Sequence, residues 1–163
     1  MTRRALPLLV ALGPAAMLGG ALFSQYVGGL LPCHMCLWQR WPHAIAIGLG
    51  VAGYLAGPGR PGGLALLLGA LALAIGSGLG GFHAGVELGY WDGPSTCTGG
   101  SVAGLTPAEV VARLKAAPLV RCDEVAWSFL GVSMAGWNGV LSAALAVVWA
   151  GAARAYASSS VSQ

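Results

Sequence analysis

Long apolar stretches separated by short polar segments dominate this chain. Four windows contain no Asp, Glu, Lys or Arg, at residues 5–39, 41–59, 61–86 and 125–153. Each window can hold about 20 apolar residues, which is the length that lets an α-helix cross roughly 30 Å of hydrocarbon. The pattern therefore predicts four membrane-spanning helices, at about 6–26, 41–57, 64–83 and 129–150.

The composition agrees with a membrane protein. Of the 163 residues, 56% are hydrophobic and only 8% are charged, whereas soluble domains carry about 25% charged residues. The N-terminal segment also fits a secretory signal, but its apolar run continues through Leu22 and Phe23, so we expect it to remain as the first span. The net charge of +3 comes from scattered basic residues and gives no nucleic-acid signature.

Four spans predict a simple organisation. The fold class is an all-α integral membrane protein, a four-transmembrane-helix bundle formed by one domain over residues 1–155. The loops 27–40 and 84–128 then share one side of the membrane, opposite the two termini. We expect residues 156–163 to form a disordered tail.

The cysteines indicate which side of the membrane each loop faces. Basic residues divide evenly between the two sides, so the positive-inside rule gives no orientation. All four cysteines lie in the two loops, and an even set of loop cysteines is typical of an oxidising compartment. We therefore predict periplasmic cysteine loops and cytoplasmic termini.

The second loop contains one predicted helix, "TPAEVVARLKAAP", at residues 106–118. Thr106, Pro107 and Glu109 form a capping-box sequence with proline at the first helical position. Apolar residues can share one face of this helix, so it is amphipathic and can lie on the membrane surface. Packing of the helix on the end of the bundle is an equally open alternative.

The segment "PCHMCLWQR" carries the candidate chemistry, and three interpretations of it stay open. The first is soft-metal transport, because Cys33, His34, Met35 and Cys36 are all possible ligands. However, the two middle residues rarely converge with the cysteines, and there is no second C-x-x-C. The second interpretation is inert disulfides. A bridge between Cys97 and Cys122 would stabilise the fold by roughly 3–4 kcal/mol, but a bridge within C-x-x-C constrains almost nothing.

The third interpretation is a redox dithiol. C-x-x-C pairs at helix starts often do redox work, because the helix N-terminus and nearby cations favour the thiolate. Arg40 follows Cys36 by one helical turn and can stabilise a thiolate or donate to an oxygen-bearing ligand, although contact with lipid headgroups is its alternative role. Two cysteine pairs at a membrane suggest a relay from a soluble protein to a membrane-dissolved quinone by thiolate–disulfide exchange.

Several segments together resemble the disulfide bond formation protein B (DsbB) family. They are "PCHMCLWQR", "FHAGVELGYW", the cysteine in "STCTGG", and "CDEVAWSFLGVSMAGWN", which occur in family order over nearly the whole chain. The resemblance implies a thiol:quinone oxidoreductase of the bacterial inner membrane. Such a protein reoxidises a periplasmic thioredoxin-like, DsbA-type partner and passes the electrons to ubiquinone or menaquinone.

The resemblance also implies a role for each site residue. Cys33 and Cys36 match the quinone-facing pair, with Cys36 as the partner of the quinone ring. Arg40 matches a quinone-contacting arginine, and His83 a histidine near the quinone pocket, although a packing role for His83 stays open. Cys97 matches the cysteine that joins the soluble partner, with Cys122 as its mate. No resident metal is expected.

This relay makes two further expectations about the second loop. Cys97 lies in "STCTGGS", a run of small residues that we expect to be flexible and accessible to a soluble partner. Cys122 can then attack the Cys33–Cys36 bridge, provided that the loop swings it to the membrane edge.

Overall fold

The computed structural model describes residues 3–95, 97, 104–116 and 120–160, and this part of the chain is mostly helical. The helices are η1 (Arg3–Ala5), α1 (Leu6–Tyr26), α2 (His34–Trp38), α3 (Arg40–Ala56), α4 (Arg60–Glu87), α5 (Pro107–Ala116), α6 (Met134–Ala157) and η2 (Ser158–Ser160). Two short antiparallel strands, β1 (Ser128–Phe129) and β2 (Val132–Ser133), form a hairpin before α6.

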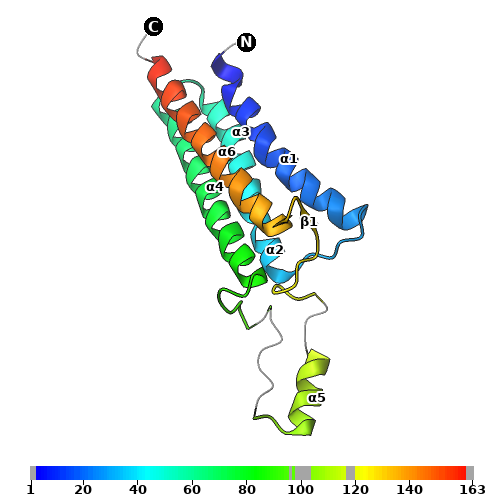
Figure 1. Ribbon diagram of the computed structural model, residues 1–163. Coiled ribbons are helices and arrows are strands. Elements are labelled where there is room, and N and C mark those ends of the chain that lie inside the picture. The colour runs from blue at the N-terminus through cyan, green and yellow to red at the C-terminus, as the bar shows by residue number, and fades with distance from the viewer. Residues whose placement is uncertain (1–2, 96, 98–103, 117–119, 161–163) are drawn as a thin grey trace.

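The long helices lie side by side. α4 packs against α6 and α3, and α1 packs against α3 and, less extensively, against α6. Figure 1 shows the two ends of the chain together at one end of the bundle, with α2 and the hairpin at the other. Leu66 and Leu73 of α4 and Trp149 of α6 are fully buried in the core between the helices.

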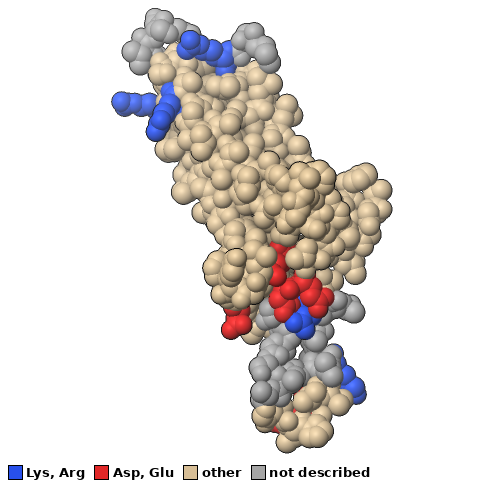
Figure 2. Space-filling view, viewed as in Figure 1, with Lys and Arg blue, Asp and Glu red and all other residues tan. Residues whose placement is uncertain are grey.

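Three helical segments, Arg3–Tyr26, Arg60–Glu87 and Met134–Ala157, are long and apolar enough to cross a membrane. The predicted second span corresponds to α3, whose 17 residues are fewer than the roughly 20 that a typical span needs. Figure 2 shows a long tan surface without charged side chains, between basic residues at the end with the termini and most of the acidic residues toward the other end.

Small residues allow α4 and α6 to approach closely, as the spacing of Gly76 and Gly80 suggests. A Cβ atom placed on Gly80 would lie 2.6 Å from the backbone nitrogen of Gly139, so glycine is required at this crossing. A larger residue at Gly80 or Gly139 would force α4 and α6 apart and lower the packing density between them. Membrane helices associate mainly through such close contacts.

The last predicted helix begins later than expected. Residues 128–133 form the β-hairpin instead, because Leu130 and Gly131 both adopt positive φ angles of 51° and 76° at its turn, as tight two-residue hairpins require. Ser133 then caps α6 by accepting a hydrogen bond from the Gly136 N–H at 3.1 Å. Apolar character alone did not reveal this break.

The predicted disordered tail is also partly wrong. α6 continues to Ala157, followed by η2. Tyr156 is buried at 1% exposure and donates a hydrogen bond from its hydroxyl to the Arg4 carbonyl oxygen at 3.4 Å. This contact of Tyr156 with the N-terminal segment buries its aromatic ring and so stabilises the last turn of α6. Residues 161–163 lie outside the described residues.

The helix predicted at 106–118 forms as α5, and residues 117–119 lie outside the described residues. Its capping box is confirmed: the Thr106 N–H donates to Glu109 Oε2 at 2.8 Å, and the Glu109 N–H donates to Thr106 Oγ1 at 3.4 Å. Figure 1 shows α5 beyond the end of the bundle where α2 lies, apart from the long helices.

Candidate redox site at the end of the bundle

The C-x-x-C segment forms the first turn of the short helix α2. Cys33 is the N-cap residue, with extended backbone, and its sulfur accepts a hydrogen bond from the Cys36 N–H at 3.2 Å. The two sulfurs are 2.8 Å apart. Because a helix N-terminus presents unpaired N–H groups and a positive dipole end, it favours a thiolate at this position.

The thiols of this pair differ strongly in acidity. A hydrogen bond from the Cys33 thiol lowers the pKa of Cys36 to about 7, against the opposing effect of burial. The same hydrogen bond, together with burial, raises the pKa of Cys33. Cys36 is therefore the thiolate of the reduced pair, and it is also the better leaving group in disulfide exchange.

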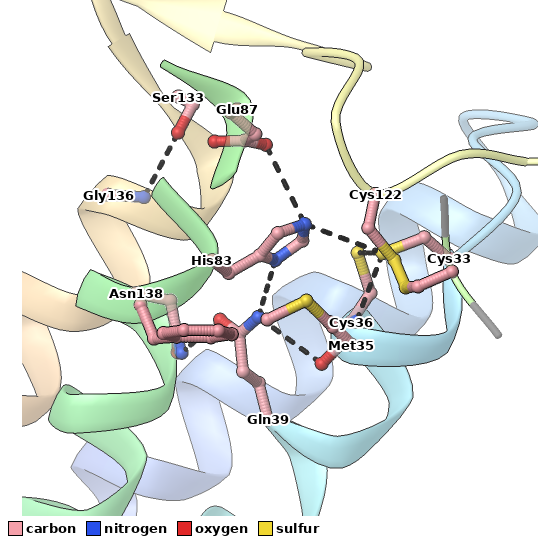
Figure 3. Close-up of polar contacts among 12 residues, drawn as sticks. Cys33, Met35, Cys36, Gln39, His83, Glu87, Cys122, Ser133, Gly136 and Asn138 are labelled. Carbon is pink, nitrogen blue, oxygen red and sulfur yellow. Dashed lines mark hydrogen bonds and ion pairs between the residues drawn. A yellow bond between two sulfur atoms is a disulfide. The ribbon is translucent and has the colours of Figure 1, made fainter. Parts of the chain in front are cut away.

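The second cysteine pair lies directly against the first. Cys97 and Cys122 form a disulfide across 25 positions of sequence, with their Cα atoms 5.3 Å apart. The sulfurs of Cys33, Cys97 and Cys122 all lie within 4.8 Å of one another. Figure 3 shows Cys122 beside Cys33 at the start of α2. All four cysteines thus share one end of the bundle, as the loop assignment predicted.

This geometry corrects the two expectations about the second loop. Cys97 is 1% exposed and Cys122 is 0% exposed, so Cys97 is not accessible to a soluble partner in this conformation. No swing is needed to bring Cys122 to Cys33, because the two sulfurs are already neighbours. Thr96 and residues 98–103 lie outside the described residues.

His83 of α4 joins the cysteine cluster. Its Nε2 lies 3.6 Å from Cys33 Sγ and 4.0 Å from Glu87 Oε1. Its Nδ1 lies 2.7 Å from Nε2 of Gln39, which also donates to the Met35 carbonyl oxygen at 3.2 Å. The imidazole is therefore held between the amide and the first sulfur, as Figure 3 shows.

The Gln39 amide links the cysteine cluster to α6 and α3. The Asn138 amide nitrogen donates to Gln39 Oε1 at 2.7 Å, and Asn138 Oδ1 pairs with His43 Nε2 at 2.9 Å. Gln39 and His43 are buried. Such a chain of buried polar groups holds its members in one arrangement when each bond is made.

A cavity of about 300 Å³ adjoins the cysteines. Its lining includes Cys33, Cys36 and Arg40, and it extends along α1 from Ser24 to Ala16, a distance of about 12 Å at the helical rise. The cavity therefore combines the redox sulfurs with an apolar wall that reaches into the uncharged part of the bundle.

Arg40 lines this cavity and has one strong hydrogen-bond partner and one buried donor without a partner among the described residues. Its guanidinium donates to Gln25 Oε1 at 2.6 Å, while its buried Nε–H has no partner among the described residues. A planar guanidinium with a free donor suits a carbonyl oxygen. The residues present thus fit a largely apolar ligand with a carbonyl oxygen.

The two charges that flank Cys122, on Arg121 and Asp123, pair with each other. Arg121 donates two hydrogen bonds to Asp123 and also pairs with Glu124 at 3.3 Å. The hydrogen bond from Arg121 lowers the pKa of the Asp123 carboxyl. Because this ion pair is internal to the segment, neither charge acts alone on the Cys122 sulfur.

Sequence reasoning missed several members of this site. Asn138 and His43 were not assigned a role, Gln39 entered only as part of a motif, and Glu87 was given no chemistry. A signal was present, because polar residues inside apolar spans usually face the bundle interior and mark functional sites. Conversely, His34 is exposed and its ring packs on Trp38 at 5.0 Å, away from the cluster.

Comparison with known proteins gives a consistent result. A protein-family profile described as "Disulfide bond formation protein DsbB" matches residues 3–152. "Disulfide bond formation protein B" of Polaromonas sp. (strain JS666 / ATCC BAA-500) is 34% identical over 155 residues, covering 91% of this chain and 88% of that protein.

The protein of the same name from Xanthomonas oryzae pv. oryzae (strain MAFF 311018) is 33% identical over 153 residues. That match covers 90% of this chain and 87% of the relative. No solved structure matches the chain significantly.

Proposed function

The chain belongs to the disulfide bond formation protein B (DsbB) family, whose members are oxidoreductases that support disulfide bond formation, and we propose that it is a membrane thiol:quinone oxidoreductase. In this proposal it oxidises a periplasmic, thioredoxin-like DsbA-type dithiol protein and reduces ubiquinone or menaquinone. The observation that carries the proposal is the contact between the two cysteine pairs beside a deep, mainly apolar cavity.

The first step is disulfide exchange with the soluble partner. A partner thiolate attacks Cys97, forms a mixed disulfide there and expels Cys122 as a thiolate. The second partner thiol then resolves the mixed disulfide and leaves Cys97 reduced. Since Cys97 is buried, the segment that carries it must open before this attack, and the opening precedes chemistry in each cycle.

The second step passes the electrons between the pairs. The Cys122 thiolate attacks Cys33, which lies within 4.8 Å, and breaks the Cys33–Cys36 bond. Cys36 leaves as the thiolate, in keeping with its pKa of about 7. Attack by Cys97 on Cys122 re-forms the Cys97–Cys122 bridge and releases Cys33.

A bound quinone supplies a two-electron acceptor that takes up two protons. Arg40, which lines the cavity, would orient a carbonyl oxygen through its guanidinium group, and the α1 wall of the cavity would hold the apolar part of the ligand. His83, fixed by Gln39, would hold a hydrogen bond to the Cys33 sulfur as Cys33 returns to the disulfide. The roles of all four cysteines, Arg40 and His83 are thus part of this proposal.

The proposal includes a four-span topology, with α1, α3, α4 and α6 crossing the bacterial inner membrane and both termini in the cytoplasm. The clustering of the cysteines at the end opposite the termini supports it. A membrane-impermeant thiol reagent is expected to label all four cysteines when reduced cells are treated intact and the labelled protein is recovered. The buried Cys33, Cys97 and Cys122 should react more slowly than Cys36, as their segments open. Labelling only after the inner membrane is opened contradicts this orientation.

The activity itself is tested by quinone reduction with purified protein and a reduced thioredoxin-like partner. Cys36→Ser should abolish quinone reduction but leave Cys97–Cys122 able to oxidise one equivalent of partner. Cys122→Ser should accumulate a covalent complex through Cys97. Repeated turnover of Cys36→Ser with quinone would mean that electrons leave by another route.

A further inference from the structure

The reduced Cys33–Cys36 pair lies beside two further side chains, His83 and Glu87, that can act as metal ligands. Cys33 Sγ, Cys36 Sγ and His83 Nε2 all lie within 4.8 Å of one another, and Glu87 of the next turn of α4 faces the same imidazole nitrogen at 4.0 Å. Two thiolates, one imidazole and one carboxylate are together a typical donor set for Zn²⁺.

We propose that the reduced Cys33–Cys36 pair, together with His83 and Glu87, binds one Zn²⁺ ion, which holds the protein in its reduced state and blocks turnover. The site exists only in the dithiol form, because a disulfide offers no thiolate ligands. Zinc is then an inhibitory ligand of this protein and not its resident cofactor.

The distances support a tetrahedral site. Zinc bonds of about 2.3 Å to sulfur and about 2.0–2.1 Å to nitrogen place neighbouring sulfur and nitrogen ligands about 3.6 Å apart. The observed separation of Cys33 Sγ and His83 Nε2 is 3.6 Å. Two sulfur ligands would be about 3.8 Å apart. The sulfurs of Cys33 and Cys36 are 2.8 Å apart, so the Cys36 side chain must rotate enough to move its sulfur away by about 1 Å.

Glu87 provides the independent observation that points to a ligand. Its side chain is 6% exposed. The Ser133 side chain hydrogen-bonds to the carboxyl group, but the Oε2 atom has no hydrogen-bond partner among the described residues. A buried carboxylate oxygen without a partner is costly. A cation held by the sulfurs and His83 would satisfy it. Glu87 lies outside the group of ligand atoms within 4.8 Å of one another, which Cys33, Cys36 and His83 form, so its side chain must turn toward the sulfurs to complete four-coordination.

Surrounding groups can orient the ligands. The Cys36 N–H already donates to Cys33 Sγ, and a ligating histidine usually has its second ring nitrogen held by a hydrogen bond. The Gln39 amide nitrogen lies against Nδ1. Turning the amide oxygen to Nδ1–H would leave Nε2 free for the metal, and it would break the hydrogen bonds that Gln39 makes with Asn138 and with the Met35 carbonyl oxygen. Zinc binding by His83 would break the hydrogen bond of its ring with the Cys122 backbone.

Binding balances without electron transfer. Two zinc–sulfur bonds, one zinc–nitrogen bond and one zinc–oxygen bond form, and the two thiols lose their protons to solvent. The resulting thiolates are weaker nucleophiles for the quinone step and for disulfide exchange, since the metal uses one lone pair of each sulfur and withdraws its charge. The inference uses the dithiol state that the proposed catalytic cycle generates, but binding can be measured without any quinone.

The test uses full-length protein with Cys97→Ser and Cys122→Ser, reduced, freed of reductant and kept anaerobic in detergent. Co²⁺ is the spectroscopic probe, and Zn²⁺ is added as its competitor. We expect one Co²⁺ per chain, with the intense visible bands of a tetrahedral site and a thiolate charge-transfer band, and displacement by one equivalent of Zn²⁺. Absence of saturable binding, or equal binding by the oxidised protein, overturns the inference.

Variants separate the ligands from general effects. His83→Gln should weaken Zn²⁺ binding by more than the roughly 10–100-fold that loss of an outer-shell partner costs, while His83→Cys, which keeps a soft ligand and reports on folding, should retain it. The matched control is His34→Gln, whose exposed ring packs on Trp38 and whose loss should leave affinity unchanged. Equal losses in the His34 and His83 variants contradict the proposal.

The fourth ligand and the inhibition are tested separately. Glu87→Gln should lower Zn²⁺ affinity and alter the Co²⁺ spectrum, and an unchanged spectrum removes Glu87 from the site and overturns the four-ligand form. In the wild-type protein, Zn²⁺ should stop turnover and a chelator should restore it. If the wild type never reduces quinone but the Co²⁺ spectrum appears, the proposed function fails and the metal site stands.

Discussion

The hydrogen bond between the two thiols of the C-x-x-C pair makes a quantitative prediction about Cys36. Accepting this bond from Cys33 is the largest cause of the fall in the Cys36 pKa from 9.0 to about 7. Cys33→Ala removes the donor and leaves burial, which raises the pKa, as the largest remaining cause. The pKa of Cys36 should then return to 9.0 or above, which corresponds to a loss of thiolate at pH 7 from about one half to about 1%.

The rate of alkylation should change less than the thiolate population. A more basic thiolate is also more nucleophilic, with a Brønsted coefficient of about 0.4–0.5, so two pKa units raise the rate of the thiolate itself about 6–10-fold. At pH 7 the variant should therefore react only about 5–8-fold more slowly. Above pH 9 it should react faster than the parent, and the two pH profiles should cross.

The assay follows iodoacetamide modification of Cys36 by mass spectrometry, in reduced protein with Cys97→Ser and Cys122→Ser. The parent profile should have its midpoint near pH 7, and the Cys33→Ala profile near pH 9 or above. His34→Gln is the control, because its exposed ring packs on Trp38 outside the cluster. A midpoint that stays near pH 7 without Cys33 would refute the reasoning and assign the acidity to the helix N-terminus and Arg40.

Three further predictions follow from packing, ligand binding and capping. Gly80→Ala should lower the free energy of unfolding by about 1–3 kcal/mol, because its Cβ would meet the α6 backbone at Gly139. Gly81→Ala, whose Cβ would meet nothing within 4 Å, should be neutral or stabilising in thermal unfolding. Similar losses in both variants would contradict the close-packing argument. Arg40→Ala and Arg40→Lys should raise the KM for quinone in steady-state assays while Cys97 still forms the mixed disulfide, and an unchanged KM in both would leave Arg40 without a role toward quinone. Glu109→Ala should destabilise α5 through loss of the capping box. The loss is measurable as faster amide exchange at Thr106 and residues 108–110, and unchanged exchange would show that the cap contributes nothing.

The sequence predicted those parts of the fold that depend on local pattern. Apolar length located the long helices, and the capping box located α5, because both signals lie within one element. The hairpin at 128–133 was missed, since Leu130 at positive φ is rare for a large side chain. The order of Tyr156 was missed because it depends on a contact with Arg4, which is 152 positions away.

In the candidate site too, the sequence predicted the residues that lie on one segment but not the contacts between distant segments. Spacing indicated Cys33, Cys36 and Arg40, because they lie on one short segment. The approach of His83 to Cys33 joins residues 50 positions apart, and only the packing of α4 beside α2 brings them together. No local pattern distinguishes His34, which faces outward, from a ligand or an acid–base group.

Burial of the second cysteine pair changes what limits the proposed relay. Cys122 and Cys33 are neighbours while Cys97 and Cys122 are oxidised, so electron transfer between the pairs needs no search by a long loop. Access is the remaining barrier, because the partner must reach a sulfur that is 1% exposed. Substitutions that loosen the Cys97 segment should therefore speed formation of the mixed disulfide, whereas the step from Cys122 to Cys33 should slow, since loosening disperses the sulfurs that the closed conformation holds together.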